Sequence, residues 1–215
     1  MTSAADRAPL QVAVVTGNHP FDVPGFHRLF GEMPGIDAYV QDLENWVHDW
    51  GQVRRSYDAV VFYHFHQETP QGAFAEAVEE LGASGMGVVV LHHALLAWPQ
   101  WPEWSALCGI EDRCFGYHMG QQVRVEVADP DHAVTQGLTA WEMGDETYTM
   151  ADAGEGNRVL LTIEHPLSMR TAAWTRTHKE ARVFCLQSGH DQAAWGAPGF
   201  KTVLHRGILW AAGRI

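Results

Sequence analysis

Two stretches decide the fold of this 215-residue chain: residues 11–16, QVAVVT, and residues 87–91, GVVVL. Both are short, β-branched runs with little alternation between apolar and polar residues, which is typical of strands buried on both faces of a parallel sheet. Residues 58–62, DAVVF, and 182–186, RVFCL, have the same character. The intervening stretches carry apolar residues at helical spacing, so the sequence predicts parallel strands that alternate with crossover helices.

Four helical segments are predicted between or after these strands. Apolar residues recur at helical spacing in residues 26–33, 70–81 and 199–212, and two prolines begin a new segment at 99–107. Residues 36–40 offer a further short strand. We therefore expect a three-layer α/β sandwich with a mainly parallel central sheet.

The pattern changes after Gly116. Val123 and Val125 alternate with polar neighbours, which predicts a strand with one face in water. Residues 159–163 and 172–175 are further strand candidates, and 141–148 form an irregular or edge segment. We interpret residues 116–180 as an antiparallel insertion on the parallel core, within a single domain over 11–215 that follows an N-terminal tail at 1–10.

The charge balance narrows the expected partners. The formal net charge is -12, with 26 acidic residues against 14 lysines and arginines, so the basic footprint of a nucleic-acid-binding protein is missing. No apolar run approaches the roughly 20 residues that cross a bilayer, and residues 1–9 lack a secretory pattern. We expect a cytoplasmic protein that binds neither nucleic acid nor membrane.

Three cysteines are present, and they are expected to be reduced structural residues. Cys108 and Cys114 are close in sequence but lack the CxxC spacing of structural zinc sites. Cys185 lies within an apolar run and has the character of a small buried hydrophobe.

Histidines follow four of the predicted strands, which is the main functional signal. They occur at His19, at His64 and His66, at 92–93, and at His190. Because the carboxyl ends of parallel strands share one edge of a sheet, where ligands bind in such folds, these histidines should converge. Imidazole titrates near neutral pH and binds metals, although a histidine at the end of a strand can also be a simple hydrogen-bonding cap.

Three residues are the candidates for catalysis. His92 and His93 are adjacent and should point in opposite directions, and we choose His93 as the one that faces the crevice. His190 follows a glycine and precedes an acid that could orient an imidazole, and Glu146 supplies a carboxylate. His93, His190 and Glu146 would also suit zinc or a similar divalent metal, although no fixed-spacing metal motif is present and no other cofactor is indicated.

Short motifs along the chain resemble those of the ThuA-like proteins. They are GVVVLHHA (87–94), DPDH (129–132), DETY (145–148), AWTR (173–176), RVFCLQSGHD (182–191) and RGILWAAG (206–213). The ordered set covers residues 11–213, although each motif alone is weak. The resemblance implies a bacterial protein of carbohydrate catabolism with a fold of the class I glutamine amidotransferase-like, or flavodoxin-like, kind.

The resemblance also bears on individual residues. Related amidotransferases place a nucleophilic cysteine on the turn that corresponds to residues 91–94, where this chain has histidine, and the nearest cysteine is 14 residues beyond Ala94. Thiolate-based glutamine hydrolysis is therefore not expected. Trp174 and Arg176 would offer a ring and a guanidinium to a sugar-like ligand, and His19 with Asn18 would also contact it.

Two functions remain open at this point. The first is an enzyme, either an isomerase, a lyase or a hydrolase, that acts on a sugar or oxidised-sugar derivative by acid–base or metal-assisted chemistry. The alternative is a non-catalytic ligand-binding or regulatory module on an amidotransferase-like scaffold, since a fold alone does not determine function. In both cases the expected partner is a small carbohydrate-like molecule, and self-association into a homo-oligomer is left open.

Overall fold

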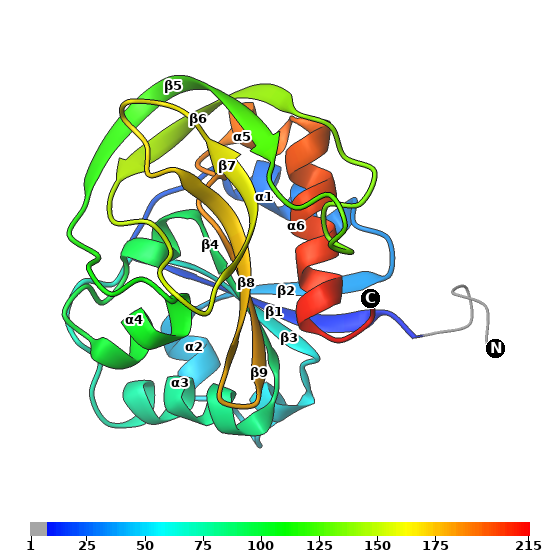
Figure 1. The fold of residues 1–215 in the computed structure, drawn as a ribbon. Helices are drawn as coiled ribbons and strands as arrows, with labels where there is room; N and C mark the ends of the chain where they lie inside the picture. Colours follow the sequence, from blue (N-terminus) through cyan, green and yellow to red (C-terminus); the bar gives the residue numbers. More distant parts are fainter. Residues whose placement is uncertain (1–7) are drawn as a thin grey trace.

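The computed structural model describes residues 8–215, which are built around one nine-stranded sheet (Figure 1). In chain order the strands are β1 (Leu10–Gly17), β2 (Ile36–Asp42), β3 (Ala59–His64), β4 (Gly87–Leu91), β5 (Gly116–Val127), β6 (Trp141–Thr149), β7 (Arg158–Ile163), β8 (Thr171–His178) and β9 (Ala181–Leu186). Their order in the sheet is β2-β1-β3-β4-β9-β8-β7-β5-β6. The first five strands in this order are mutually parallel, and the predicted strands near 11–16, 58–62, 87–91 and 182–186 all belong to them.

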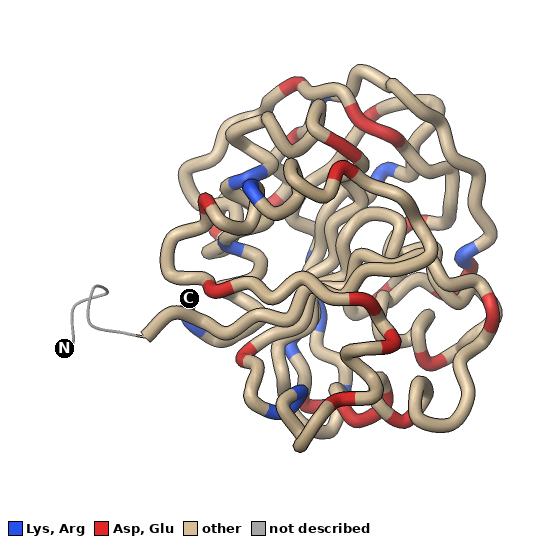
Figure 2. The backbone as a smooth tube through the Cα atoms, turned by 180° about the vertical axis from the view of Figure 1, so that it is seen from behind, with Lys and Arg blue, Asp and Glu red and all other residues tan. Residues whose placement is uncertain are grey.

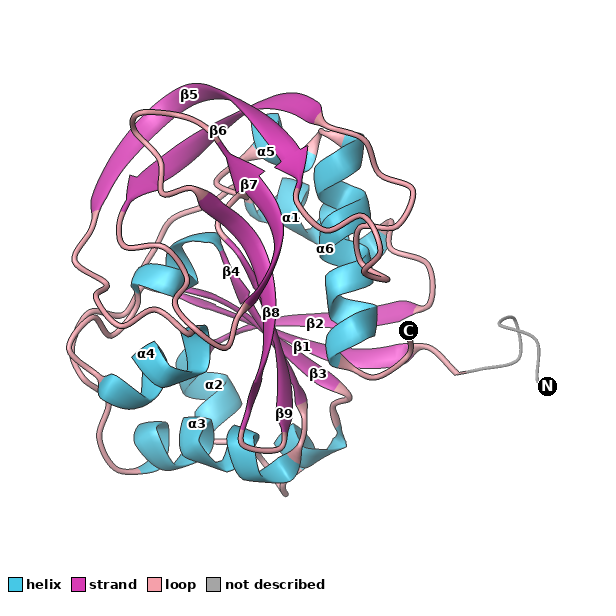
Figure 3. Ribbon diagram, in the orientation of Figure 1, coloured by secondary structure: helices cyan, strands magenta, loops and turns pink. Residues whose placement is uncertain are grey.

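Helices cover both faces of the parallel half, as expected for a three-layer sandwich (Figure 3). They are α1 (Val23–Gly31), α2 (Leu43–Val47), the 3₁₀ helix η2 (Val53–Ser56), α3 (Ala73–Ser84), the 3₁₀ helix η3 (His92–Leu96), α4 (Pro102–Cys108), α5 (Gln192–Trp195) and α6 (Pro198–Ala211). Helices α1, α5 and α6 lie on one face, and α2, α3 and α4 lie on the other.

Alternate residues of the parallel strands enter two separate cores. In β1, Val12 and Val14 pack with Phe26 of α1, whereas Ala13 and Val15 pack on the face that α2 and α3 cover. All four β1 side chains are buried. This explains why the strand shows no alternation in its sequence: a parallel strand with helices on both sides has no face in water.

Helix α1 begins earlier than its apolar spacing predicts. The Asp22 side chain accepts a hydrogen bond from the Gly25 backbone N–H and so caps the helix, and a proline occupies its first turn. Phe26, Leu29 and Phe30 form its buried stripe. The helix starts at Val23 because capping groups, and not the apolar stripe, set its first residue.

The remaining four strands form the antiparallel half of the sheet, as predicted for residues 116–180. Strand β8 pairs antiparallel with β9, and β7, β5 and β6 continue the sheet outward with antiparallel pairings. The β5–β6 register shifts between His118 and Gln121, and such irregularities bend a strand pair. Strands β5 and β6 arch over the carboxyl edge of the parallel half (Figure 1), with β6 at the edge of the sheet.

The charged residues follow the expectation from composition. Lysines and arginines are scattered along the backbone in Figure 2 and do not gather into one basic stripe. Among residues 8–215, no helix combines the length and apolar character that a membrane crossing requires. The tail expected at residues 1–10 falls mostly outside the described residues, although β1 already begins at Leu10.

Candidate active site

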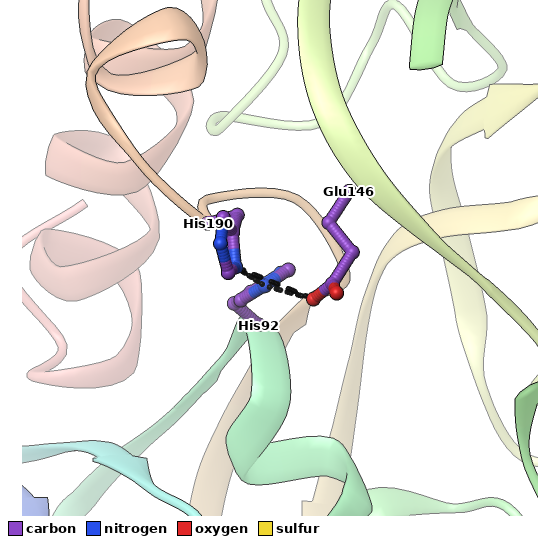
Figure 4. A group of neighbouring side chains, drawn as sticks. All are labelled: His92, Glu146 and His190. Carbon is purple, nitrogen blue, oxygen red and sulfur yellow. Dashed lines mark hydrogen bonds and ion pairs between the residues drawn. The ribbon is translucent and has the colours of Figure 1, made fainter. Parts of the chain in front are cut away.

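His92 occupies a strained turn at the carboxyl end of β4. The strand ends at Leu91, and His92 begins η3 with a backbone φ of 53°. Non-glycine residues rarely adopt this left-handed region, and such residues cluster at functional sites because the surrounding structure must hold them there. The His92 side chain is fully buried and points toward those of Glu146 and His190 (Figure 4).

The hydrogen bonds of His92 define which ring nitrogen carries its proton. Nδ1 lies 2.7 Å from the main-chain oxygen of Gln187. A carbonyl oxygen only accepts hydrogen bonds, so Nδ1 carries the proton and donates it. In the neutral ring the lone pair is therefore on Nε2, which lies 3.1 Å from Oε2 of Glu146.

Glu146 and Tyr148 reach His92 from the arch of the antiparallel half. They are two residues apart on β6 and so share one face of that strand. The Tyr148 hydroxyl lies 2.7 Å from His92 Nε2 and 3.0 Å from Glu146 Oε2, and it donates to one of them at a time. Burial raises the pKa of Tyr148 well above its ordinary value, so the phenol keeps its proton at neutral pH.

The third member of the group, His190, is positioned by a buried carboxylate. The backbone N–H groups of Gly189 and His190 donate to Oδ2 and Oδ1 of Asp145, at 2.9 and 3.0 Å. This contact ties the loop after β9 to β6 and places His190 Nδ1 3.3 Å from Glu146 Oε2. Asp145 is a positioning residue, and its own burial raises its pKa.

The electrostatics of this group favour an ionised Glu146. Burial would raise the pKa of its carboxyl, but hydrogen bonds from His190, and from His92 when its Nε2 also carries a proton, outweigh this effect and hold the pKa well below its usual range. The hydrogen bond to Glu146 in turn raises the pKa of His190. A carboxylate therefore lies between two imidazoles.

Three potential ligand atoms converge at this point (Figure 4), one each from His92, Glu146 and His190, and they lie within 4.8 Å of one another. The tautomer of His92 directs its lone pair at the Glu146 carboxylate, and two acceptors 3.1 Å apart need a proton or a cation between them. Two imidazole nitrogens and one carboxylate oxygen are a donor set that suits zinc and similar divalent ions. The main-chain contact of His92 Nδ1 is also the kind of outer contact that orients a metal-binding histidine.

Of the residues expected at the carboxyl edge, His19, His93, Glu146 and His190 line the same pocket. Its volume is about 420 Å³, and it is lined by His19, Pro20, Phe65, His93, Leu96, Phe115, Tyr117, Met119, Glu146, Tyr148 and His190. His92 lies beneath it, in contact with Glu146 and His190 but with no exposed surface. The histidines after β1, β4 and β9 therefore meet at the carboxyl edge, whereas His64 is buried and His66 lines a neighbouring cavity.

The choice of His93 as a ligand beside Glu146 and His190 differs from what the structure shows. His92 makes those contacts, while the ring of His93 stacks on that of His19 at a centroid distance of 4.1 Å. His93 Nε2 lies 3.2 Å from the main-chain oxygen of Tyr63 and donates to it. Burial lowers the pKa of both His19 and His93, so this part of the wall consists of neutral imidazoles.

Three further predicted ligand contacts lie elsewhere. Trp174 is fully buried in the core beside α4, where its indole N–H donates to the main-chain oxygen of Cys108. Arg176 donates to Asn157 and lines a different cavity. Trp174 pairs with Cys185 near the carboxyl end of β9, but both residues lie on the face of β8 that packs against α4, so their side chains point away from the pocket.

Asn18 is also outside the pocket. It has a backbone φ of 54° and lines a neighbouring cavity, together with His66 and Glu68. His19, one residue later, is the part of this segment that reaches the pocket. The sequence pair Asn18-His19 therefore divides between two cavities.

Two residues of the site were not selected from the sequence. His92 is the first residue after a predicted strand, where a sharp turn of the amidotransferase kind would place its side chain in the site. Tyr148 is two residues after Glu146, and an alternating strand pattern at 141–148 would have placed both on one face. Residues 141–148 were interpreted as an irregular or edge segment. Recognising them as a regular strand would have placed Tyr148 beside Glu146 in the site.

None of the pocket's lining residues is a cysteine. Cys108 and Cys185 are buried in the core beside α4, and Cys114 is exposed next to the pocket residue Phe115. The strained turn at His92 therefore lies where an amidotransferase would place its nucleophile, but it carries an imidazole and not a thiol.

Comparison with known proteins agrees with this architecture. The family model described as "ThuA: Trehalose utilisation" matches residues 15–211. The chain belongs to the ThuA family. Among curated proteins, no significant sequence match is found for this ThuA protein.

Solved structures extend the likeness to the fold. A ThuA-like protein from Parabacteroides merdae is 21% identical, with a TM-score of 0.77 over 96% of this chain and 91% of the other. A ThuA-like protein from Bacteroides uniformis is 18% identical, with a TM-score of 0.76 over 98% and 95%. A glutamine amidotransferase from Thermotoga maritima is 11% identical, with a TM-score of 0.54 over 94% and 98%. These similarities confirm the expected amidotransferase-like fold.

Proposed function

We propose that this ThuA protein is an enzyme that acts on a sugar or oxidised-sugar derivative at a divalent metal held by His92, Glu146 and His190. One observation carries the proposal: single ligand atoms of His92, Glu146 and His190 converge within 4.8 Å of one another beside a pocket, with His92 Nε2 3.1 Å from the Glu146 carboxylate. A cation among these atoms would take the place of the proton that otherwise links His92 Nε2 to Glu146, and it would leave positions open for water or substrate.

The carbohydrate class rests on the family and on the size of the pocket. The family description is trehalose utilisation. A volume of about 420 Å³ falls within the range of about 300–1,000 Å³ typical of small-molecule sites. The pocket also combines a few convergent polar groups with apolar walls, which is how such sites orient a ligand.

A bound metal would supply Lewis acidity, which polarises a carbonyl or hydroxyl oxygen of the substrate. The chain supplies the proton-transfer groups. The Tyr148 phenol, whose pKa is raised by burial, stays protonated and can donate a hydrogen bond. His19, whose pKa is lowered by burial, stays neutral and can accept a proton.

A base and an electrophile on different walls suit reactions next to a sugar ketone. Enolisation, isomerisation and elimination each remove a proton beside a carbonyl and stabilise the resulting enolate. Glutamine hydrolysis is not proposed, because histidine stands at the elbow where the amidotransferase thiolate would be needed. An isomerase or lyase is favoured over a hydrolase, since the pocket groups match proton transfer more directly than attack by a nucleophilic side chain.

The metal centre is tested by comparing two adjacent histidines. Zinc content of the purified protein, after dialysis against zinc and removal of the excess, should be one equivalent per chain. His92→Ala should lose this zinc, whereas His93→Ala should keep it, because only His92 contacts Glu146 and His190. His27→Ala, at an exposed position of α1, is the matched control.

The outcomes of this experiment separate the alternatives. Zinc retained by His92→Ala would contradict the ligand set, and zinc lost from His93→Ala alone would restore the assignment made from sequence. A folded wild-type protein that takes up no divalent metal would leave the three residues as a hydrogen-bonded group, with a proton on His92 Nε2 in place of the cation.

The chemistry is tested by hydrogen exchange. Keto derivatives of methyl glucopyranoside, oxidised in turn at C2, C3 and C4, should exchange protons beside the carbonyl with D₂O when the protein is added, as followed by NMR. Glu146→Gln should abolish the exchange. Absence of exchange or conversion with every derivative, in a protein that binds these sugars, would favour the non-catalytic binding module.

A further inference from the structure

The outer part of the pocket is lined mainly by apolar side chains, whereas its base carries the imidazoles and the carboxylate. Tyr117 and Met119 occupy alternate positions at the start of β5 and share one face of the strand, and Phe115 comes one residue before the strand. All three line the pocket, and Tyr117 pairs in register with Tyr148 of β6. The apolar row therefore begins beside the proposed catalytic group and extends away from it.

Two members of this row are unusually exposed. Tyr117 is 64% exposed and Met119 is 56% exposed. Polar side chains at these two positions would cost little packing, so their apolar character calls for another explanation. Exposed apolar side chains that gather around a pocket mark a binding surface, whereas isolated ones need no explanation. Here they line the pocket that also contains Glu146 and His190.

Aromatic rings connect the base of the pocket to this row. The ring of Phe65 lies 5.9 Å from that of His19 and 6.2 Å from that of Phe115, both in edge-to-face arrangements. Leu96 completes the apolar wall. The inner part of the pocket contains its imidazoles and its carboxylate, which belong to His19, His93, Glu146 and His190. The outer part consists of Phe65, Leu96, Phe115, Tyr117 and Met119, and the Tyr117 hydroxyl is the one polar group among these side chains.

We propose that this outer part binds an aromatic group attached to the sugar, so that the substrate class is an aryl glycoside or its oxidised derivative. The orientation, with the sugar ring at the His92–Glu146–His190 group, rests on the proposed function. An aromatic ring is held by edge-to-face and stacked contacts with other rings, and methionine sulfur adds favourable contacts with ring edges.

A second sugar ring fits this surface less well. A sugar can stack one face on an aromatic ring, but hydroxyl groups surround its edge and need partners when they leave water. Phe65, Leu96, Phe115 and Met119 provide none from their side chains. An aromatic group buries apolar surface on all sides without leaving such groups unpaired.

The test compares binding of matched glucosides. Isothermal titration calorimetry with phenyl and methyl glucopyranoside of the same anomer, and with trehalose, should show the phenyl glucoside binding at least about tenfold more tightly than either of the others, a difference of about 1.4 kcal/mol. Tyr117→Ala and Met119→Ala should each remove most of that preference, because each should weaken binding of the phenyl glucoside more than binding of the methyl glucoside. Trp50→Ala, at another exposed aromatic, is the matched control.

The outcomes distinguish this inference from the proposed function. Equal affinity for phenyl and methyl glucoside, or tighter binding of trehalose, would overturn the aryl assignment while metal uptake and hydrogen exchange stand. A phenyl preference that persists in Glu146→Gln, with exchange abolished, would support both. Preference for phenyl in a protein that lacks metal and exchange would support the aryl site alone, and absence of binding to all three probes would overturn it.

Discussion

The two halves of the sheet contribute to the pocket in different ways. In the parallel half the functional residues come just after the strands, as with His19 after β1, His92 after β4 and His190 after β9. In the antiparallel half they lie within a strand, as with Glu146 and Tyr148 of β6. Topology alone brings the first set together, because parallel strands share a carboxyl edge.

The second set depends on curvature. Glu146 reaches His92 because β5 and β6 arch over the carboxyl edge (Figure 3), and the register shift between His118 and Gln121 accompanies that bend. The parallel half therefore presents imidazoles at its carboxyl edge. The antiparallel half adds the carboxylate and the apolar row of the outer pocket.

The largest expected effect tests whether the antiparallel half supplies an essential group. Glu146→Gln keeps the size of the side chain and removes its charge, so turnover should fall by about 10²–10⁴-fold, the contribution typical of a positioned acid–base or ligand group. Turnover is measured as proton exchange on the active keto glucoside. His190→Ala should cost about 10²-fold or more by the same assay.

Glu142→Gln is the control for this substitution, since Glu142 lies on the same strand and is exposed. Its turnover should match that of the wild type. If Glu146→Gln kept full activity while His190→Ala lost it, the parallel half would carry the chemistry alone, and the arch would serve only to cover the site.

A smaller effect tests the difference in burial between the halves. In β4, Val89 and Val90 point to opposite cores and both are buried, so each change to alanine should lower the free energy of unfolding by about 1–3 kcal/mol. In β5, Val125→Ala should cost a similar amount, but Arg124→Ala should cost less than about 1 kcal/mol, because Arg124 is exposed and pairs only at the surface. Urea denaturation measures all four variants. A large loss of unfolding free energy in Arg124→Ala, or a negligible loss in either valine variant of β4, would contradict the proposed difference in burial between the two halves.

The smallest expected effect concerns the cysteines. A variant with Cys114→Ser, Cys108→Ala and Cys185→Ala should keep its turnover, because none of the three lines the pocket. Its free energy of unfolding should fall, since Cys108 and Cys185 are buried. Loss of turnover in a folded variant would mean that a thiol takes part in the reaction.

The parallel half could be predicted well from the sequence. Uninterrupted β-branched runs such as residues 87–91 reflect burial on both faces, and helices between them leave little choice but a parallel sheet. The shared edge then followed from topology, and His19, Glu146 and His190 do line one pocket. These features depend on patterns that extend over many residues.

Single-residue geometry could not be predicted in the same way. The choice between His92 and His93 depends on the φ of 53° at His92, which no periodic pattern encodes. Trp174 and Arg176 were placed at the site, but both lie on the face of β8 that packs against α4. The face that a strand residue occupies and the strain at a turn both depend on tertiary packing.

The hydrogen bond from His92 to position 187 has a consequence for mutational robustness. Its acceptor is the main-chain oxygen of Gln187 and not the side chain. A substitution at position 187 that preserves the backbone therefore leaves the proton on His92 Nδ1, so sequence drift there does not change which nitrogen faces Glu146. The tautomer of His92 therefore depends on the path of the backbone. The Gln187 side chain has a separate role, since its Oε1 accepts hydrogen bonds from the Tyr148 backbone N–H and the Ser168 hydroxyl.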